Sequence, residues 1–230
     1  MFLLIPKNNS HNGHKQHLST VFNEFIRREI ITKNPFLSIH NLPENTQRHI
    51  PYNDKEKKLL KEYFERHNPR LGKFCQVQYY LSIRPIELLQ VQIRDINMSE
   101  NYVMIWGGNA KNRKQEAVYF PGSCKKLFTS FKIHKHEATD YLFGHKLITC
   151  GRPYNRNRVS ELHSAVIKDL QLNKFHTLYS WKHTGACAFH RKYKDVYKLM
   201  RHLRHNDVRM TMIYIRQLGL DFKTNNMPKF

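Results

Sequence analysis

The spacing of apolar residues constrains this sequence more than any other feature, because it follows a helical period in one segment after another. Such stripes predict helices over residues 20–31, 54–66, 73–81, 156–170, 178–191, 195–204 and 207–218, and a short one over 85–89. Asp54, Asp195 and Asn206 are the expected N-caps. Residues 7–17 are polar and rich in turn formers, so we expect them to be poorly ordered.

One region departs from the helical pattern. Residues 102–106 and 116–120 are rich in β-formers and are joined by the sequence GGNAKNRKQ, which predicts a hairpin with a mobile, basic tip. The expected fold is therefore mostly α with one small antiparallel β-sheet, an α+β arrangement.

The charge balance points to a polyanionic partner. The chain has 39 Lys and Arg against 18 Asp and Glu, a formal net charge of +21, which would repel itself in a compact protein. Nucleic acid is the favoured partner, and a ribosomal or membrane-surface protein is the alternative. The positive charge is spread along the chain and not gathered in one basic amphipathic helix, so we expect no membrane partner.

Cysteine and histidine spacing predicts neither disulfides nor a metal site. Cys75, Cys124, Cys150 and Cys187 form no C-x-x-C pair, which fits reduced thiols in a cytoplasm. The 15 histidines have no carboxylate or cysteine companions at convincing spacing. These spacings predict no metal site. Because the sequence has no signal-peptide core and no apolar stretch of membrane-spanning length, we expect a soluble, cytoplasmic protein.

Several reactive side chains follow one another in a particular order. The segment LSIRPIELLQ contains Arg84 and, three residues later, Glu87; Lys111 follows in the hairpin tip, 27 residues after Arg84. The segment LYSWKHTGACAF supplies Tyr179, Lys182 and His183. The segment LMRHLRHNDVRMTMIYIR supplies His205 and, nine residues later, Tyr214.

This order resembles the tyrosine recombinase (phage integrase) family over residues 18–218. Members carry an arginine in an R-x-x-E turn, a lysine on a β-hairpin, a His-x-x-Arg-His helix, and a histidine or tryptophan nine residues before the nucleophilic tyrosine. Arg84, Lys111, His205 and Tyr214 match these positions. Where the family has His-x-x-Arg this chain has Tyr179-x-x-Lys182, a variant similar to that of some bacterial mobile-element integrases.

The resemblance implies that Tyr214 cuts DNA through a 3′-phosphotyrosine bond. Arg84, Lys182 and His205 would stabilise the phosphate oxygens, Lys111 would protonate the leaving oxygen, and Glu87 would support the site. The substitutions have consequences of their own: lysine lacks the planar fork of arginine, and a tyrosine at 179 can donate a hydrogen bond but is a poor general base near neutral pH.

Other interpretations of the same residues stay open. Lys114 competes with Lys111 for the general-acid role, His183 could be a buried structural histidine, and Tyr214 could be a core aromatic. The basic residues outside the cluster are expected to contact the DNA backbone: Arg113, Lys114, Arg152, Arg156 and Arg158.

The family also implies an organisation and an assembly. We expect an incomplete, initially disordered remnant of a helical core-binding domain over residues 1–33, a linker over 34–53, a catalytic domain over 54–218 and a tail over 219–230. The partner would be double-stranded DNA, bound by a homo-tetramer, with a monomer allowed in the free state. No cofactor would be required, and the protein would be associated with the nucleoid. The apolar residues Met227, Pro228 and Phe230 of the tail would dock onto a neighbouring copy.

Two rival functions remain. The chain could be a catalytically silent DNA-binding remnant or regulator derived from an integrase, or a type IB topoisomerase-like nicking enzyme that needs no assembly of sites.

Overall fold

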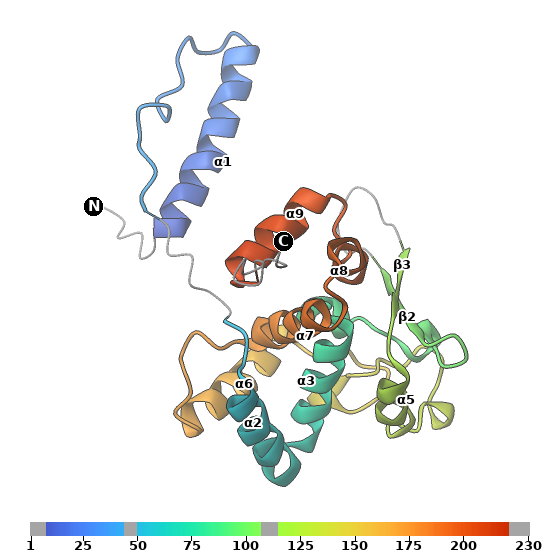
Figure 1. Cartoon of the computed structure of the whole chain (residues 1–230). Coiled ribbons are helices and arrows are strands. Elements are labelled where there is room, and N and C mark those ends of the chain that lie inside the picture. The colour runs from blue at the N-terminus through green and yellow to red at the C-terminus, as the bar shows by residue number, and fades with distance from the viewer. Residues whose placement is uncertain (1–7, 44–49, 107–114, 221–230) are drawn as a thin grey trace, which may run out of the picture. The chain divides into compact units, whose positions relative to one another are not determined.

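The computed structural model describes residues 8–43, 50–106, 115–220 of the chain (Figure 1). It divides the chain into two compact units, residues 1–48 and 49–230. Within the described residues, none of the helices combines the length and the apolar character that crossing a bilayer requires.

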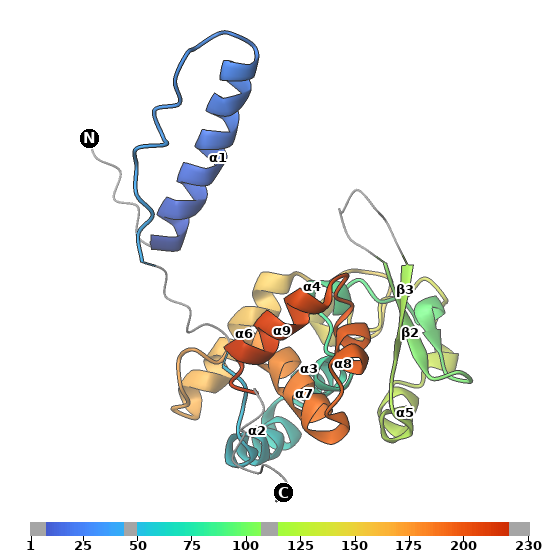
Figure 2. The same ribbon diagram turned by 45° about the horizontal axis from the view of Figure 1, so that its top comes forward.

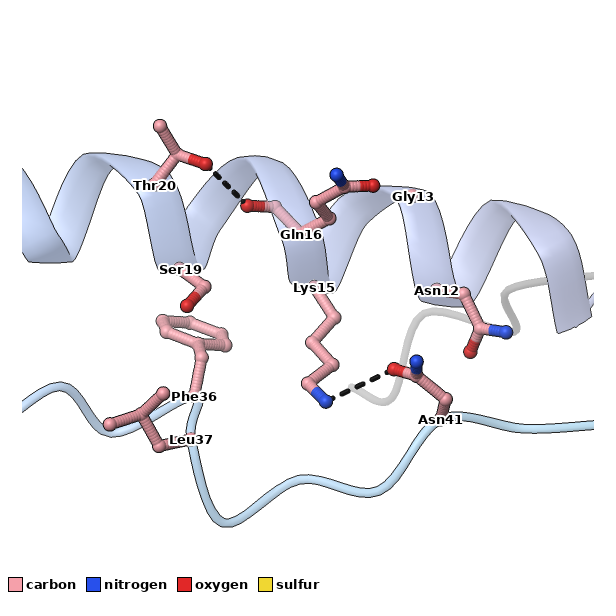
Figure 3. A pocket seen from close by; sticks show the side chains of 9 residues that line it. All are labelled: Asn12, Gly13, Lys15, Gln16, Ser19, Thr20, Phe36, Leu37 and Asn41. Atoms are coloured by element: carbon pink, nitrogen blue, oxygen red, sulfur yellow. Dashed lines mark hydrogen bonds between the residues drawn. The ribbon is translucent and has the colours of Figure 1, made fainter. Parts of the chain in front are cut away.

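The first unit is helix α1 (Asn8–Arg27) with the segment that follows it folded back along its side. The side-chain amide of Asn12 donates to the Leu42 carbonyl and accepts from the Leu42 amide, both at 2.8 Å. In the polar pocket between helix and segment, Lys15 Nζ donates to Asn41 Oδ1 at 3.0 Å (Figure 3). Residues 8–17 are therefore helical, which corrects the expectation of poor order; these long-range contacts compensate for weak helix propensity.

The second unit contains the remaining helices and the sheet. The helices are α2 (Asp54–His67), α3 (Pro69–Leu81), α4 (Pro85–Leu88), α5 (Gly122–Thr129), α6 (Arg156–Asp169), α7 (Leu178–Tyr193), α8 (Val196–Leu203) and α9 (Val208–Gln217). The strands are β1 (Ile96–Asn97), β2 (Tyr102–Trp106) and β3 (Gln115–Tyr119). Single 3₁₀ turns cover Ile93–Asp95, Ile133–Lys135 and His145–Leu147.

The sheet is antiparallel with strand order β1-β2-β3, and β2 and β3 form the predicted hairpin. Val103 pairs with Val118, and both are buried. Helix α5 follows directly after β3, and its Phe128 ring packs on Phe120 with 4.7 Å between centroids. The mostly helical fold with one small antiparallel sheet is confirmed; the hairpin tip, residues 107–114, lies outside the described part of the chain.

Helices α3 and α7 lie side by side at the centre of this unit, as both views show (Figures 1 and 2). Gly185 of α7 allows the approach, because its Cα faces the backbone of Tyr79 in α3. The surrounding core is made of fully buried side chains, among them Leu60, Leu71, Phe74, Leu81, Ile83, Leu88, Phe128, Leu142 and Phe143. This close packing joins α7, which carries Tyr179, Lys182 and His183, to α3, which ends just before Arg84.

Two of the three expected N-caps are displaced by one residue. The N-cap of α2 is Asn53, not Asp54: its side chain accepts from the Glu56 amide while Glu56 accepts from the Asn53 amide, a capping box. The N-cap of α9 is Asp207, not Asn206, and it accepts from the Arg209 amide. The prediction of Asp195 as N-cap of α8 is confirmed.

Candidate active site

The Arg84 turn begins where α3 ends. Ser82 takes a left-handed conformation at the end of α3, and Pro85 opens α4 with Arg84 as its extended N-cap. The Glu87 carboxylate then accepts from the Arg84 amide at 2.9 Å and from Arg84 Nη1 at 2.8 Å. These two bonds hold a guanidinium that is still 48% exposed and able to meet a ligand.

A second guanidinium reaches the same carboxylate. Arg204, the residue that ends α8, places Nη2 2.5 Å from Glu87 Oε2. Burial raises the pKa of Glu87, but the charge of Arg204, followed by the hydrogen bonds and charge of Arg84, outweighs burial and leaves it below its ordinary value. Glu87 is therefore an ionised carboxylate between two arginines.

Lys182 on α7 adds a buried ammonium to this cluster. Lys182 is 5% exposed. Burial, followed by the nearby positive charge of Arg84, lowers the pKa of Lys182 to about 8. The Glu87 carboxylate opposes that shift and Arg204 adds to it. The cluster therefore has more positive than negative charge, which suits it to bind an anion.

The depressed pKa of Lys182 predicts opposite effects of pH on activity and on stability. We expect the second-order rate of reaction with DNA to fall above about pH 8, because the free protein then loses the ammonium. Stability should instead rise between about pH 8 and 10.5, where the unfolded lysine keeps a proton that the folded one has released. The check is a pH profile at subsaturating DNA. In Lys182→Arg the alkaline fall should disappear, because arginine stays charged; an unchanged fall would assign it to another group.

His205 lies in the short connection between α8 and α9. Its Nδ1 is 2.9 Å from Thr211 Oγ1, and its ring meets the Tyr214 ring edge-on with 5.8 Å between centroids. Burial, and then the charges of Lys182 and Arg84, lower the pKa of His205 to about 4. The ring is thus neutral near pH 7 and can act as a hydrogen-bond donor.

Tyr214 on α9 contacts two histidines, His183 and His205. Its Oη lies 2.7 Å from Nδ1 of His183, the neighbour of Lys182 on α7, and the two rings are 5.3 Å apart. Burial, followed by the nearby Cys187, raises the pKa of Tyr214 above its ordinary value. The phenol is therefore protonated and hydrogen-bonded in the free protein.

The other sequence-predicted residues fall into three groups. Tyr179 lies one turn before His183 on α7, with 6.3 Å between their rings. Lys111, Arg113 and Lys114 lie outside the described residues. The remaining basic residues, Arg152, Arg156 and Arg158, are exposed at the start of α6 and just before it, and Arg158 forms an exposed pair with Glu161 at 2.9 Å.

Two residues at the cluster were not anticipated, Arg204 and His202. His202 stacks on Phe189 at 4.2 Å, and burial, then the charges of Lys182 and Arg204, lower the pKa of His202 to about 4. Both residues lie in the basic sequence RHLRH of residues 201–205, and nothing in the local sequence distinguishes them from the exposed Arg201. Among the described side chains, no group of three His, Cys, Asp or Glu could hold a metal ion.

A helical domain with a hairpin at one edge, in which cations from several elements gather around one carboxylate and a histidine next to them contacts a helix-borne tyrosine, is the arrangement of a tyrosine-type site-specific recombinase. The model of the phage integrase family matches residues 69–219, more than half of the 230-residue chain. The chain belongs to the phage integrase family.

Several solved structures have a similar fold. The Tn1549 transposon integrase in complex with a circular intermediate DNA has a TM-score of 0.75 at 14% identity, over 90% of this chain and 74% of that one. A lambda integrase dimer bound to a COC′ core site has a TM-score of 0.71 at 15% identity, over 93% and 75%. XerA recombinase has a TM-score of 0.60 at 22% identity, over 78% and 65%. A search of curated proteins returned no match.

Proposed function

We propose that this chain cleaves and rejoins double-stranded DNA through a 3′-phosphotyrosine intermediate on Tyr214. The observation that carries the proposal is the position of the phenol. It is hydrogen-bonded at 2.7 Å to His183, next in sequence to Lys182, and its ring contacts His205. His205 connects the tyrosine to the cations, because its ring contacts Tyr214 while the charges of Lys182 and Arg84 lower the pKa of its imidazole.

In the proposed reaction, Tyr214 Oη forms a bond to the phosphorus as the bond to the 5′-oxygen breaks in line. Nδ1 of His183 is placed to accept the phenol proton. The leaving oxygen takes a proton from Lys111, whose role rests on the sequence resemblance. Rejoining reverses these steps, and the phosphotyrosine bond conserves the energy that it needs.

The remaining residues act on the phosphate. Arg84 and the charged form of Lys182 would bind the non-bridging oxygens, where charge builds up in the transition state. Neutral His205, whose Nδ1 contacts Thr211, would donate through its other ring nitrogen. Tyr179 would contribute a hydrogen bond from one turn along α7.

The proposed partner is duplex DNA, contacted along its backbone by the exposed Arg152, Arg156 and Arg158, together with Arg113 and Lys114 of the hairpin tip. Solved relatives of similar fold are bound to DNA. By analogy with the family, four copies would assemble on two sites, and binding to chromosomal DNA would place the protein with the nucleoid. Residues 221–230, which include Met227, Pro228 and Phe230, lie outside the described residues; their docking onto a neighbour stays a proposal.

We further propose that the first unit is part of a helical core-binding domain. Helix α1 carries an apolar stripe at helical spacing: Leu18 is 43% exposed, Val21 48% and Phe25 36%. A stripe of this kind is buried when further helices pack against it. The proposed boundaries are those given by the sequence, with residues 54–218 as the catalytic domain.

The proposal is tested with a pool of nicked DNA duplexes of randomised sequence, in which a cut strand cannot be rejoined. We expect a protein–DNA band that survives denaturant and disappears after protease treatment. DNA binding without such a band would favour a silent DNA-binding protein. Relaxation of a supercoiled plasmid by single protomers would favour a topoisomerase-like activity.

A further inference from the structure

Arg204 holds a position between three separate elements. Its side chain is only 8% exposed, and it extends from the end of α8, one residue before His205. Its Nη2 pairs with Glu87 of α4 at 2.5 Å, and its Nη1 lies 3.6 Å from Glu116 of β3. A single guanidinium therefore joins the Arg84 turn, the hairpin and the connection that carries His205.

The contact with Glu87 is the stronger of the two. Glu87 is 12% exposed, so its pair with Arg204 is shielded from water, whereas Glu116 is 38% exposed. Glu87 also accepts two hydrogen bonds from Arg84, one from the amide and one from Nη1. Because Arg204 binds the same oxygen as the Arg84 amide, it fixes the rotation of the carboxylate against which the Arg84 guanidinium is aligned.

We propose that Arg204 is a positioning residue for the strand-cleavage reaction, which holds the Glu87 carboxylate and, through it, aligns the Arg84 guanidinium with the scissile phosphate. This role rests on the proposed function. Arg204 itself is engaged by carboxylates on both of its terminal nitrogens, so it acts through Glu87 and not by contact with DNA.

The contact with Glu116 extends the role to the hairpin. Glu116 is the second residue of β3, which follows the hairpin tip in the chain. The ion pair therefore connects the strand that leads out of the tip to the helix that ends at His205. With both contacts, Arg204 can hold β3 of the hairpin at a fixed distance from the Arg84 turn.

The test compares two substitutions that make the same backbone change. Arg204 and Lys194 are both left-handed C-cap residues, with φ of 59° and 49°, and Lys194 is exposed at the end of α7. Glycine suits this conformation, so either replacement is tolerated by the backbone. At saturating nicked DNA we expect Arg204→Gly to slow adduct formation by about 10- to 100-fold, the usual effect of removing a supporting partner. Lys194→Gly should react at the wild-type rate.

Three further measurements separate positioning from general stabilisation. The dissociation constant of Arg204→Gly for DNA should stay close to that of Lys194→Gly, so that the loss is in the maximal rate, measured at a temperature at which both variants are folded. Arg204→Lys should recover part of the rate, because lysine can still pair with Glu87 but lacks the fork. In a Glu87→Gln background, Arg204→Gly should have no additional effect, since both act through one carboxylate.

A wild-type rate in Arg204→Gly, or losses that multiply in the double variant, would overturn the positioning role. Absence of any adduct from the wild-type protein is a different result: it removes the proposed function, and the role of Arg204 with it.

Discussion

We expect the Tyr214→Phe variant to form no covalent adduct with nicked DNA while it binds the same DNA as tightly as the wild-type protein. Removal of a nucleophile typically slows an enzyme by roughly six orders of magnitude, which places any residual reaction below detection. The phenylalanine ring keeps the contacts with His183 and His205, so only the hydroxyl and its 2.7 Å hydrogen bond are lost. The cost to stability should be about 1 kcal/mol.

The measurement is the denaturant-resistant band on the nicked substrate, with DNA affinity measured in parallel. Tyr197→Phe is the matched control, because Tyr197 is 62% exposed on α8 and should react normally without its hydroxyl. If Tyr214→Phe still forms the band, another residue is the nucleophile and the proposed mechanism is wrong. If the wild-type protein and Tyr197→Phe both bind DNA but form no band, the chain is a silent DNA-binding member of the family.

Those parts of the fold that depend on local sequence could be predicted from it. The bounds of β2 agree with the β-rich run 102–106, and α6 begins at the expected Arg156. In both places the alternation or periodicity of side chains determines the element directly. Helix α5 was not predicted, since its short sequence GSCKKLFT follows the turn residue Pro121 and carries few apolar residues.

Long-range contacts decided the rest, and the candidate site shows why they could not be predicted. The R-x-x-E spacing placed Glu87 near Arg84, because three residues make one helical turn. By contrast, the pairing of Glu87 with Arg204 spans 117 residues and depends on how α8 packs against the arginine turn. The bond between His183 and Tyr214 spans 31 residues and depends on the packing of α7 against α9. The sequence placed the reactive residues in a plausible order but did not give their partners.

The largest effect on stability should come from a single methyl group at Gly185. In Gly185→Ala the new Cβ would lie 1.9 Å from the Tyr79 carbonyl oxygen and 2.8 Å from its carbon. Both atoms belong to the backbone of α3, so no side-chain rotation can relieve the clash and the two central helices must separate. We expect a loss of about 3 kcal/mol or more, at the upper end for overpacked cores. That is a large part of the total stability of a typical domain, about 5–15 kcal/mol.

Urea unfolding of the variant checks this prediction against Gly122→Ala, which places the same methyl group in helix α5 with nothing within 4 Å. Alanine favours a helix over glycine by up to about 1 kcal/mol, so the control should be unchanged or slightly more stable. Because Lys182 is on the same helix as Gly185, separation of α3 and α7 should also displace the buried ammonium from Arg84 and Glu87 and slow strand cleavage at temperatures where the variant is folded. A loss of less than about 1 kcal/mol in Gly185→Ala would mean that the two helices are not in backbone contact.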